Sequence, residues 1–335
     1  MFKTSVAALA PAAGWICIVA RVTYPGPAFV ASRLGGELLA QRRVPLEGFG
    51  ELAPFIADPR VTDVFANGPG EVWVDRGTGL VREEVMLSES TLRELAVRLV
   101  SLGGRHVDEA NPLVDVRLFD GIRVHAVLPP ISPAGTLLSI RLPSDTRLTV
   151  TDPRLIDLVE RRANLLLTGA GGSGKTTLLA ALLSLADASE RIVAIEDVAE
   201  LRVQHPQFIA LEARQSNLEG VGEISLARLL REALRMRPDR LVLGEVRGSE
   251  IRELLSALNT GHDGGAGTLH ANSLADVPAR LEALGALAGM SDRAIARQAV
   301  SAIGAVIHLS RVDGVRSVEA IGHLGLGPDG RLVIL

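Results

Sequence analysis

The stretch Gly169-Ala170-Gly171-Gly172-Ser173-Gly174-Lys175-Thr176-Thr177 fits the pattern G-x-x-x-x-G-K-[ST] of a phosphate-binding loop, the P-loop. Glycines allow the backbone N–H groups of such a loop to turn inward around phosphate oxygens, and the helix that follows directs its positive end at the same anion. The lysine reaches the β- and γ-phosphates, and the hydroxyl of Thr176 ligates Mg²⁺. The residues predicted to bind ATP with Mg²⁺ are Gly171, Gly172, Ser173, Gly174, Lys175, Thr176 and Thr177.

The residues on either side of the loop favour this interpretation over a chance glycine-rich turn. Residues 164–168, Asn-Leu-Leu-Leu-Thr, are suited to a buried parallel strand, and residues 178–186 are rich in leucine and alanine, as a helix should be. Among the 35 basic residues of the chain only Lys3 and Lys175 are lysines. Arginine occupies every other basic position, so the lysine in the loop indicates that its compact ammonium group is needed there.

Length and composition limit the class of protein. A chain of 335 residues with 47% hydrophobic residues can form two domains with sizeable cores. The net charge of −4 lacks the basic balance of a nucleic-acid-binding protein, so direct binding of nucleic acid is not expected. The single cysteine, Cys17, excludes an intramolecular disulfide, and no Cys and His cluster predicts a metal site besides the ion that accompanies the nucleotide.

Residues 1–45 are expected to form an irregular N-terminal arm. The apolar run over residues 5–20 has the outline of a signal peptide, but it is too short to cross a bilayer, and Pro11 and Gly14 interrupt it. We therefore expect a poorly ordered arm rather than a signal peptide.

Residues 46–142 predict a small α+β domain. Residues 71–75 alternate between polar and apolar types as a strand does, and residues 88–102 place leucines on one face of a helix with Ser88 as its N-cap. Two further alternating runs flank Asp120-Gly121, which is a strong β-hairpin signal. Residues 143–152 are expected to link this domain to the next.

Residues 153–335 predict an α/β domain whose strands alternate with helices, as in a parallel sheet. Several of its apolar strands are followed at once by a polar or ionisable group. In open α/β sheets the ligand lies beyond the carboxyl ends of the strands. We therefore expect these groups to gather around the nucleotide although they are far apart in the chain; they are Thr168, Glu196, Asp197, Glu245 and His270.

Phosphoryl transfer needs positioning and neutralisation of charge rather than covalent help, and this suggests a role for each group. Glu245 occupies the place of a Walker B acid, so it is predicted to hold Mg²⁺, directly or through water, and to polarise the attacking water. Glu196 is predicted to be a general base or to contact Mg²⁺ through water; a solvated strand end is the alternative. His262 and His270 lie in the glycine-rich stretch 260–273 and are predicted to sense the γ-phosphate, with structural hydrogen bonding as the alternative.

Arginines are the remaining candidates, because the planar guanidinium group binds phosphate oxygens in pairs. Two of them, Arg123 and Arg141, belong to the first domain, so that domain is predicted to close over the nucleotide and to open after hydrolysis. An ordinary surface charge is the alternative for each arginine. The candidates are Arg123, Arg141, Arg235, Arg237 and Arg240.

Taken in order, these segments resemble the type II/IV secretion ATPases and, among them, most closely the tight-adherence (Tad/Flp) pilus assembly ATPases. The resemblance covers about residues 46–310. It rests on the P-loop and on four other segments. These are residues 108–118, residues 191–197, which are similar to the "Asp box" of the family, residues 234–248, which are similar to its Walker B segment, and residues 260–273, which are similar to its "His box".

The resemblance implies a RecA-like P-loop ATPase domain behind a smaller N-terminal α+β domain, assembled as a hexameric ring on the cytoplasmic side of a membrane machine. It implies ATP hydrolysis that powers pilus assembly or protein secretion, with an inner-membrane platform protein as partner. It also implies that Arg123 and Arg141 reach nucleotide phosphate. The chain differs from longer relatives in its short, unusual N-terminus, and it lacks the tetracysteine metal site of some type II secretion relatives.

Two other functions remain open at this point. One is a DNA-translocating, conjugation-type ATPase of the same fold, which the acidic net charge argues against. The other is a nucleotide-dependent switch that does not hydrolyse ATP, which the full set of acids and histidines argues against.

Overall fold

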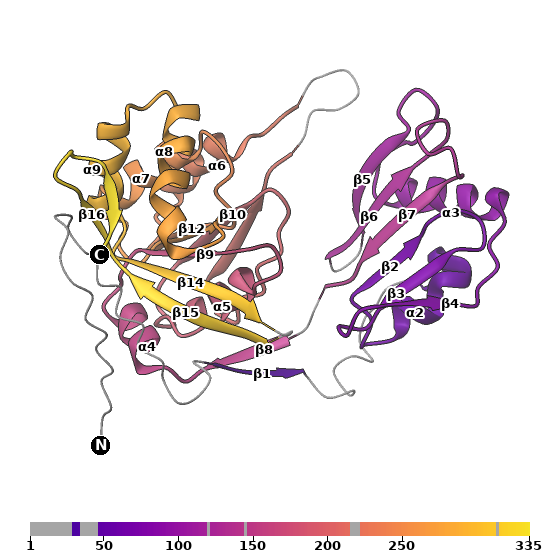
Figure 1. Cartoon of the computed structure of the whole chain (residues 1–335), viewed down its shortest axis with the longest axis horizontal. Coiled ribbons are helices and arrows are strands. Elements are labelled where there is room, and N and C mark those ends of the chain that lie inside the picture. The colour runs from indigo at the N-terminus through magenta and orange to yellow at the C-terminus, as the bar shows by residue number, and fades with distance from the viewer. Residues whose placement is uncertain (1–28, 34–45, 119–120, 144–145, 215–221, 313–314) are drawn as a thin grey trace, which may run out of the picture.

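The computed structural model describes residues 29–33, 46–118, 121–143, 146–214, 222–312 and 315–335. Figure 1 shows two separate sheets, one in the indigo-to-magenta N-terminal part and one in the magenta-to-yellow C-terminal part. The predicted N-terminal arm lies outside the described residues except for 29–33. Within the described residues, no helix is both long enough and apolar enough to cross a bilayer.

The N-terminal part is a six-stranded antiparallel sheet with the order β4-β3-β2-β7-β6-β5. Alternate residues of its strands are buried, as on β6, where Ile122, Val124 and Ala126 face the core. The short helices η1 (Leu46–Leu52) and α2 (Ala53–Ala57) and the longer α3 (Glu89–Leu102) cover this face. The strands are β2 (Asp63–Ala66), β3 (Val72–Asp75), β4 (Leu80–Glu83), β5 (Leu113–Leu118), β6 (Ile122–Val127) and β7 (Leu137–Arg141).

Helix α3 forms where the leucine spacing predicts it. The Ser88 hydroxyl caps the helix by accepting the backbone N–H of Thr91 at 3.1 Å. Leu92, Leu95 and Leu99 are buried against the sheet. The hairpin predicted around Asp120-Gly121 is confirmed by the antiparallel pairing of β5 with β6, although residues 119–120 lie outside the described residues.

The C-terminal part is a seven-stranded sheet with the order β11-β10-β12-β13-β9-β14-β15. Every neighbouring pair is parallel except β14 with β15, which is antiparallel. The strands are β9 (Leu165–Gly169), β10 (Ile192–Glu196), β11 (Phe208–Glu212), β12 (Arg240–Leu243), β13 (Ala266–His270), β14 (Ala305–Val312) and β15 (Val315–Gly322). A separate pair, β16 (Leu324–Leu326) and β17 (Leu332–Ile334), follows at the end of the chain.

The central strands are apolar throughout because helices cover both faces of this sheet. Leu165 and Leu167 pack on one side with α4 (Pro153–Glu160) and α5 (Lys175–Leu183), and Leu166 packs on the other side. The helices of that second side are α6 (Leu226–Ala233), α7 (Ile251–Leu258), α8 (Val277–Leu287) and α9 (Asp292–Ala302). Helix α5 follows β9 directly, so the P-loop connects the middle of the sheet to a buried helix.

Two features differ from the sequence-based expectations. Residues 29–33, within the arm expected to be irregular, form strand β1 (Phe29–Arg33), and β1 pairs antiparallel with β8 (Thr146–Val150) inside the expected linker. Strands β4 and β11 lie at sheet edges, where alternation of polar and apolar residues is weak because little of either strand is buried. The domain boundaries at 142 and 152 stay predictions.

Candidate functional site

The P-loop and the predicted acids meet at the carboxyl edge of the seven-stranded sheet. In the strand register Gly169 lies opposite His270, and Ile195 lies opposite Leu243. Because these strands are parallel, the segments that follow them leave the sheet at the same edge. The order of the strands in the sheet differs from their order in the chain. This edge therefore brings together residues that are about a hundred positions apart in the sequence.

The loop owes its shape to glycines in conformations that other residues avoid. Gly172 has φ of 71° and Gly174 has φ of 97°, both in the left-handed region. A Cβ atom on Gly169 would lie 2.4 Å from the backbone oxygen of Leu309, so the neighbouring strand β14 also requires glycine there. Gly174 is the N-cap of α5, which places the start of this helix at the end of the loop.

Several donors converge inside the loop. The Lys175 ammonium donates to the backbone oxygens of Gly169 and Ala170, each at 3.0 Å, and the Ser173 N–H donates to the same Ala170 oxygen at 3.3 Å. The Ser173 hydroxyl is buried and has no hydrogen-bond partner within the described residues. A phosphate oxygen could replace the Ala170 carbonyl as acceptor, so the residues present fit a nucleotide phosphate.

Lys175 itself is held in a partly desolvated position. Burial lowers the pKa of its ammonium group, and the nearby carboxylate of Glu245 opposes this change. Thr176 and Thr177 follow in the first turn of α5 and are half-buried. The hydroxyl of Thr176 and the carboxylate of Glu245 are oxygen donors of the kind that Mg²⁺ prefers, so this pair fits the predicted ion.

Glu245 is the centre of a polar cluster just beyond β12. Its Oε1 lies 3.2 Å from His270 Nε2, and its Oε2 accepts a hydrogen bond from Arg247 Nη2 at 2.7 Å. Burial alone would raise the pKa of Glu245, but the hydrogen bond and charge of Arg247 hold it below the ordinary value. Burial and the charge of Lys175 lower the pKa of His270, so its ring is neutral at neutral pH and can donate one N–H.

Arg247 also reaches toward the neighbouring strand, because its Nη1 lies 3.9 Å from Asp197 Oδ2. Burial raises the pKa of Asp197, while the charge of Arg247 lowers it in part. Arg247 was not predicted as a site residue. The signal available in the sequence was its position two residues after the acid, on the segment that leaves the carboxyl end of β12.

Glu196 is turned away from this cluster into the protein. It is 4% exposed, and its carboxylate accepts the backbone N–H groups of Glu200 at 3.0 Å and Leu201 at 3.1 Å. A Cβ atom on Gly244 would lie 2.5 Å from the Glu196 side chain, so the two strands meet closely here. Burial raises the pKa of Glu196 to about 7, against the amide hydrogen bonds that lower it. Strand β10 ends at Glu196, so Asp197 already belongs to the loop that leaves the sheet.

The structure does not bring all predicted residues to the loop. His262 precedes β13, so it lies at the amino edge of the sheet, where its Nδ1 is 3.2 Å from the Ala257 oxygen. Arg237 also lies at that edge, exposed and in a left-handed conformation with φ of 53°. Arg240 is buried there and forms an ion pair with Glu190. The structure therefore places these three residues at the amino edge of the sheet, away from the P-loop.

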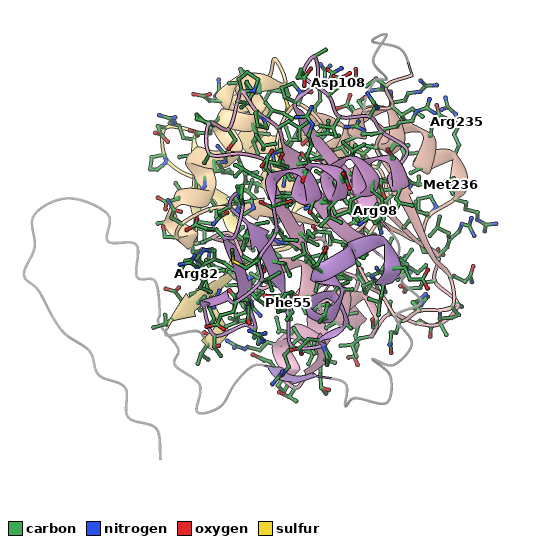
Figure 2. All side chains as sticks on the ribbon, turned by 90° about the vertical axis from the view of Figure 1, so that its right-hand side faces the viewer. Phe55, Arg82, Arg98, Asp108, Arg235 and Met236 are labelled. Carbon is green, nitrogen blue, oxygen red and sulfur yellow. The ribbon has the colours of Figure 1, made fainter. Side chains whose placement is uncertain are left out.

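Arg235, at the same edge, pairs with Glu232 at 3.1 Å, and Figure 2 places it at the periphery of the C-terminal part.

The arginines predicted from the first domain are neighbours in its sheet. Arg123 on β6 and Arg141 on β7 lie opposite each other in the strand register. Arg141 binds Asp63 of the same domain, with Nε 3.0 Å from Oδ1. Arg123 instead reaches the C-terminal part, where its Nη1 lies 2.8 Å from Glu200 Oε1. Arg123 is therefore held close to the loop that follows β10.

A second pair of residues joins the two domains beside this contact. Arg117 of β5 forms an ion pair with Glu212 at the end of β11. The β5–β6 hairpin thus meets the C-terminal part through two ion pairs, with the arginines on the hairpin and the glutamates on the C-terminal part. This contact surface lies near Asp197, whose pKa is raised by burial, a rise that the charge of Arg123 partly offsets.

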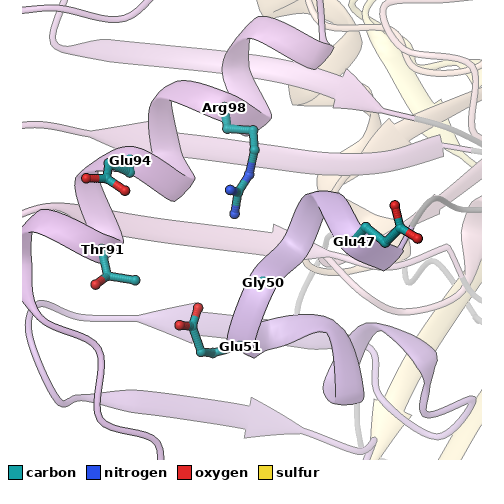
Figure 3. Close-up of a pocket in the computed structure, with 6 residues that line it drawn as sticks. All are labelled: Glu47, Gly50, Glu51, Thr91, Glu94 and Arg98. Carbon is teal, nitrogen blue, oxygen red and sulfur yellow. The ribbon is translucent and has the colours of Figure 1, made fainter.

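A hollow on the N-terminal domain lies away from this edge (Figure 3). It sits between η1 and α3, and Arg98 bridges the two by donating from Nε to the Gly48 oxygen at 3.0 Å. Its lining residues are Glu47, Gly50, Glu51, Thr91, Glu94 and Arg98. Within the described residues, no group of three or more His, Cys, Asp or Glu side chains is placed to hold a metal ion.

Known proteins resemble this chain over most of its length. The type II/IV secretion system protein family matches residues 46–313. Rv3659c of Mycobacterium tuberculosis, provisionally named a conjugal transfer protein, is 46% identical over 297 aligned positions, in an alignment that covers 82% of this chain and 84% of the relative. TrbB of Rhizobium radiobacter, a conjugal transfer protein, is 30% identical over 293 aligned positions, in an alignment that covers 82% of this chain and 87% of the relative.

Two solved structures have the same fold. The pilus retraction motor PilT with bound ADP aligns with a TM-score of 0.59 at 22% identity, covering 87% of this chain and 82% of PilT. The Legionella pneumophila ATPase DotB aligns with a TM-score of 0.51 at 21% identity, covering 84% of this chain and 77% of DotB. The expected RecA-like ATPase fold is confirmed, and the chain belongs to the type II/IV secretion system protein family.

Proposed function

We propose that this protein is a Mg²⁺-dependent ATPase that powers pilus assembly or protein secretion as a hexameric motor of the tight-adherence branch. The observation that carries the proposal is the convergence of Lys175, Glu245 and His270 at one edge of the sheet. Membership of the type II/IV secretion family supports it. In this proposal the motor works at the cytoplasmic face of a membrane, against an inner-membrane platform protein.

The loop would bind phosphate by exchanging one set of acceptors for another. The Lys175 ammonium and the Ser173 N–H share the Ala170 oxygen and would transfer to phosphate oxygens. Burial destabilises the charged form of Lys175 and lowers its pKa. A phosphate beside it would stabilise the ammonium group in place of the lost water. The start of α5 adds the favourable end of its helix dipole.

Beyond the phosphates, Thr176 and Glu245 would hold Mg²⁺, which supplies charge neutralisation for the leaving phosphate when bound. His270 keeps the Glu245 carboxylate oriented from one side and Arg247 from the other. A carboxylate fixed in this way can orient an attacking water molecule and accept its proton. Asp197, one strand away and linked through Arg247, is the acid of the Asp box that faces this cluster.

Arg123 would give the N-terminal domain its part in the cycle. In the present state it binds Glu200, and both side chains are partly exposed, so the ion pair is weak enough to exchange for phosphate. Movement of Arg123 from Glu200 to a γ-phosphate would draw the first domain over the site. Release after hydrolysis would restore the pair with Glu200.

The proposal is tested by phosphate release from purified protein with ATP and Mg²⁺. Lys175→Ala and Glu245→Gln should each abolish turnover, since they remove the phosphate-binding cation and the water-orienting acid. Glu253→Gln is a matched control, because Glu253 is as exposed as Glu245 and is also paired with an arginine, Arg231, at 3.0 Å. Full turnover in either site variant would contradict the proposal.

The hexamer is tested separately. If neighbouring subunits complete each site, turnover per subunit should rise with protein concentration, and sedimentation should show a ring of six chains in the same range. A flat response with monomeric sedimentation would remove the ring from the proposal. Catalysis without any dependence on concentration would leave the ATPase function intact.

A DNA-translocating, conjugation-type motor is the second candidate. It is favoured by the names of two relatives, Rv3659c and TrbB, which are conjugal transfer proteins. The net charge of −4 opposes it. DNA binding measured from low to physiological salt separates the two candidates: tight, salt-sensitive binding and DNA-stimulated turnover would favour the conjugation motor.

A further inference from the structure

Arg316 of strand β15 contacts the P-loop from a segment to which no function has been assigned. Its Nε donates to the backbone oxygen of Gly172 at 3.0 Å, although the two residues are 144 positions apart. Its aliphatic stem lies over the loop as well, because a Cβ atom on Gly174 would be 3.2 Å from Arg316 Cδ. Arg316 lies just beyond residue 313, where the match to the family ends.

The pairing of strands in the sheet sets the position of the Arg316 backbone relative to the P-loop. Strand β14 pairs with β9 up to the register position that joins Leu309 to Gly169, the first residue of the loop. One residue earlier, His308 and Thr168 face each other in the buried layer, with His308 Nδ1 2.9 Å from Thr168 Oγ1. Strand β15 then pairs with β14 over its length, so the position of Arg316 is set relative to the P-loop.

The carbonyl that Arg316 holds belongs to a peptide that matters for phosphate binding. In a trans peptide the C=O of Gly172 and the N–H of Ser173 point in opposite directions. Holding the Gly172 oxygen toward Arg316 on the outside therefore turns the Ser173 N–H toward the interior of the loop, where it now donates to Ala170. Gly172 is in the left-handed region, and a glycine peptide is free to rotate without such a contact.

We propose that Arg316 is a positioning residue of the nucleotide site, which pre-orders the Gly172–Ser173 peptide so that its N–H faces the phosphates. The proposal rests on the proposed function, since it assumes that the P-loop binds a nucleoside triphosphate. The contact is to the loop itself, so Arg316 assists binding of ATP and ADP alike. Without the Arg316 contact, the nucleotide must itself order the Gly172–Ser173 peptide, and the free energy of this ordering weakens binding.

The test compares Arg316→Ala with Arg316→Gln and Arg316→Lys. Arg316→Ala removes the donor, Arg316→Gln keeps a donor without charge, and Arg316→Lys keeps both a donor and the charge. Affinity for a fluorescent ATP analogue and for the matching ADP analogue should fall about three- to tenfold in Arg316→Ala, which is the range expected for one hydrogen bond. Both other variants should recover part of the loss, and kcat at saturating ATP should change less than KM.

Hydrogen exchange supplies a second measurement that needs no nucleotide. Amides of the P-loop peptide that contains Ser173 should exchange faster in nucleotide-free Arg316→Ala than in the wild type. Arg82→Ala is the matched control. Arg82 is an exposed arginine on strand β4 with a single guanidinium contact to a glycine oxygen, that of Gly70 at 3.5 Å, and Figure 2 places it on the N-terminal domain.

The outcomes distinguish this proposal from the proposed function. Wild-type protein that binds neither analogue contradicts the proposed function. Wild-type protein that binds both, with unchanged affinity and unchanged P-loop exchange in Arg316→Ala, overturns the positioning role alone. Recovery by Arg316→Lys but not by Arg316→Gln also overturns it, because the charge would then act on the phosphates directly.

Discussion

Glu196 is predicted to make the stability of the ATPase domain depend on pH. The residue is 4% exposed, and burial raises its pKa from the ordinary 4.5 to about 7. Backbone N–H groups of Glu200 and Leu201, at 3.0 to 3.3 Å, favour the ionised form and pull the pKa down. Desolvation and amide hydrogen bonding thus act in opposite directions, and an experiment can measure which is larger.

The sign follows from proton linkage. A folded-state pKa above the unfolded value means that the folded protein holds the proton more tightly. The stability from this proton is fully present below a pH of about 4.5 and is lost as the pH rises through about 7. At about 1.4 kcal/mol for each pH unit, the whole effect is about 3 kcal/mol, of which about 2.5 kcal/mol is lost between pH values of about 5 and about 8.

The assay is urea denaturation of wild type and Glu196→Gln across this pH range. The glutamine keeps an oxygen acceptor for the amides but does not titrate. The unfolding free energy of the wild type, measured relative to the variant, should fall by about 2.5 kcal/mol toward the higher pH. The N-terminal domain is the same in both proteins, so its contribution cancels in this difference.

Glu212→Gln is the control. Glu212 is the register partner of Glu196 on the neighbouring strand, but its side chain is 40% exposed. It should follow the wild-type profile. Parallel profiles for the wild type and Glu196→Gln would refute the raised pKa. If the amides rather than burial dominated, the pKa of Glu196 would lie below 4.5, and the stability of the wild type relative to the variant would change only below a pH of about 5.

Three further predictions concern other contacts. Glu200→Gln removes the partner of Arg123, and if Arg123 is needed at the phosphate, ATP affinity should rise about two- to fivefold in a binding titration, whereas unchanged affinity would contradict the exchange. Gly244→Ala places a Cβ atom against Glu196 and should cost about 1–3 kcal/mol in urea denaturation; a negligible cost would show that the strands separate easily. Ser88→Ala removes the N-cap of α3 and should cost about 1 kcal/mol in thermal denaturation, a loss that a mere surface serine would not produce.

The comparison of Glu196 with Asp197 shows where prediction from sequence stops. Both come directly after the same apolar run, residues 192–195, so the sequence pattern predicts the same role for the two acids. Glu196, the last residue of β10, packs against Gly244 and contacts backbone amides, whereas Asp197, the first residue after the strand, faces Arg247. Only the strand's register against its neighbours decides which acid is buried.

His262 and His270 illustrate a second limit. They belong to one glycine-rich stretch, so their common motif suggests one common site. Strand β13 lies between them, and its five residues span about 17 Å. His270 therefore reaches the edge with the P-loop and His262 the opposite edge. A motif read along the chain carries no information about this separation.

The amino-acid sequence alone determined the P-loop, the buried strands on either side of it and the acid at the end of β12. These features are local, because glycine conformation, side-chain chemistry and apolar runs act over a few residues. Tertiary structure alone decided that Arg247 orients Glu245, that Glu196 points inward and that Arg316 holds the loop from 144 positions away. Such contacts depend on the order in which strands pair across the sheet, and that order results from the packing of the whole domain.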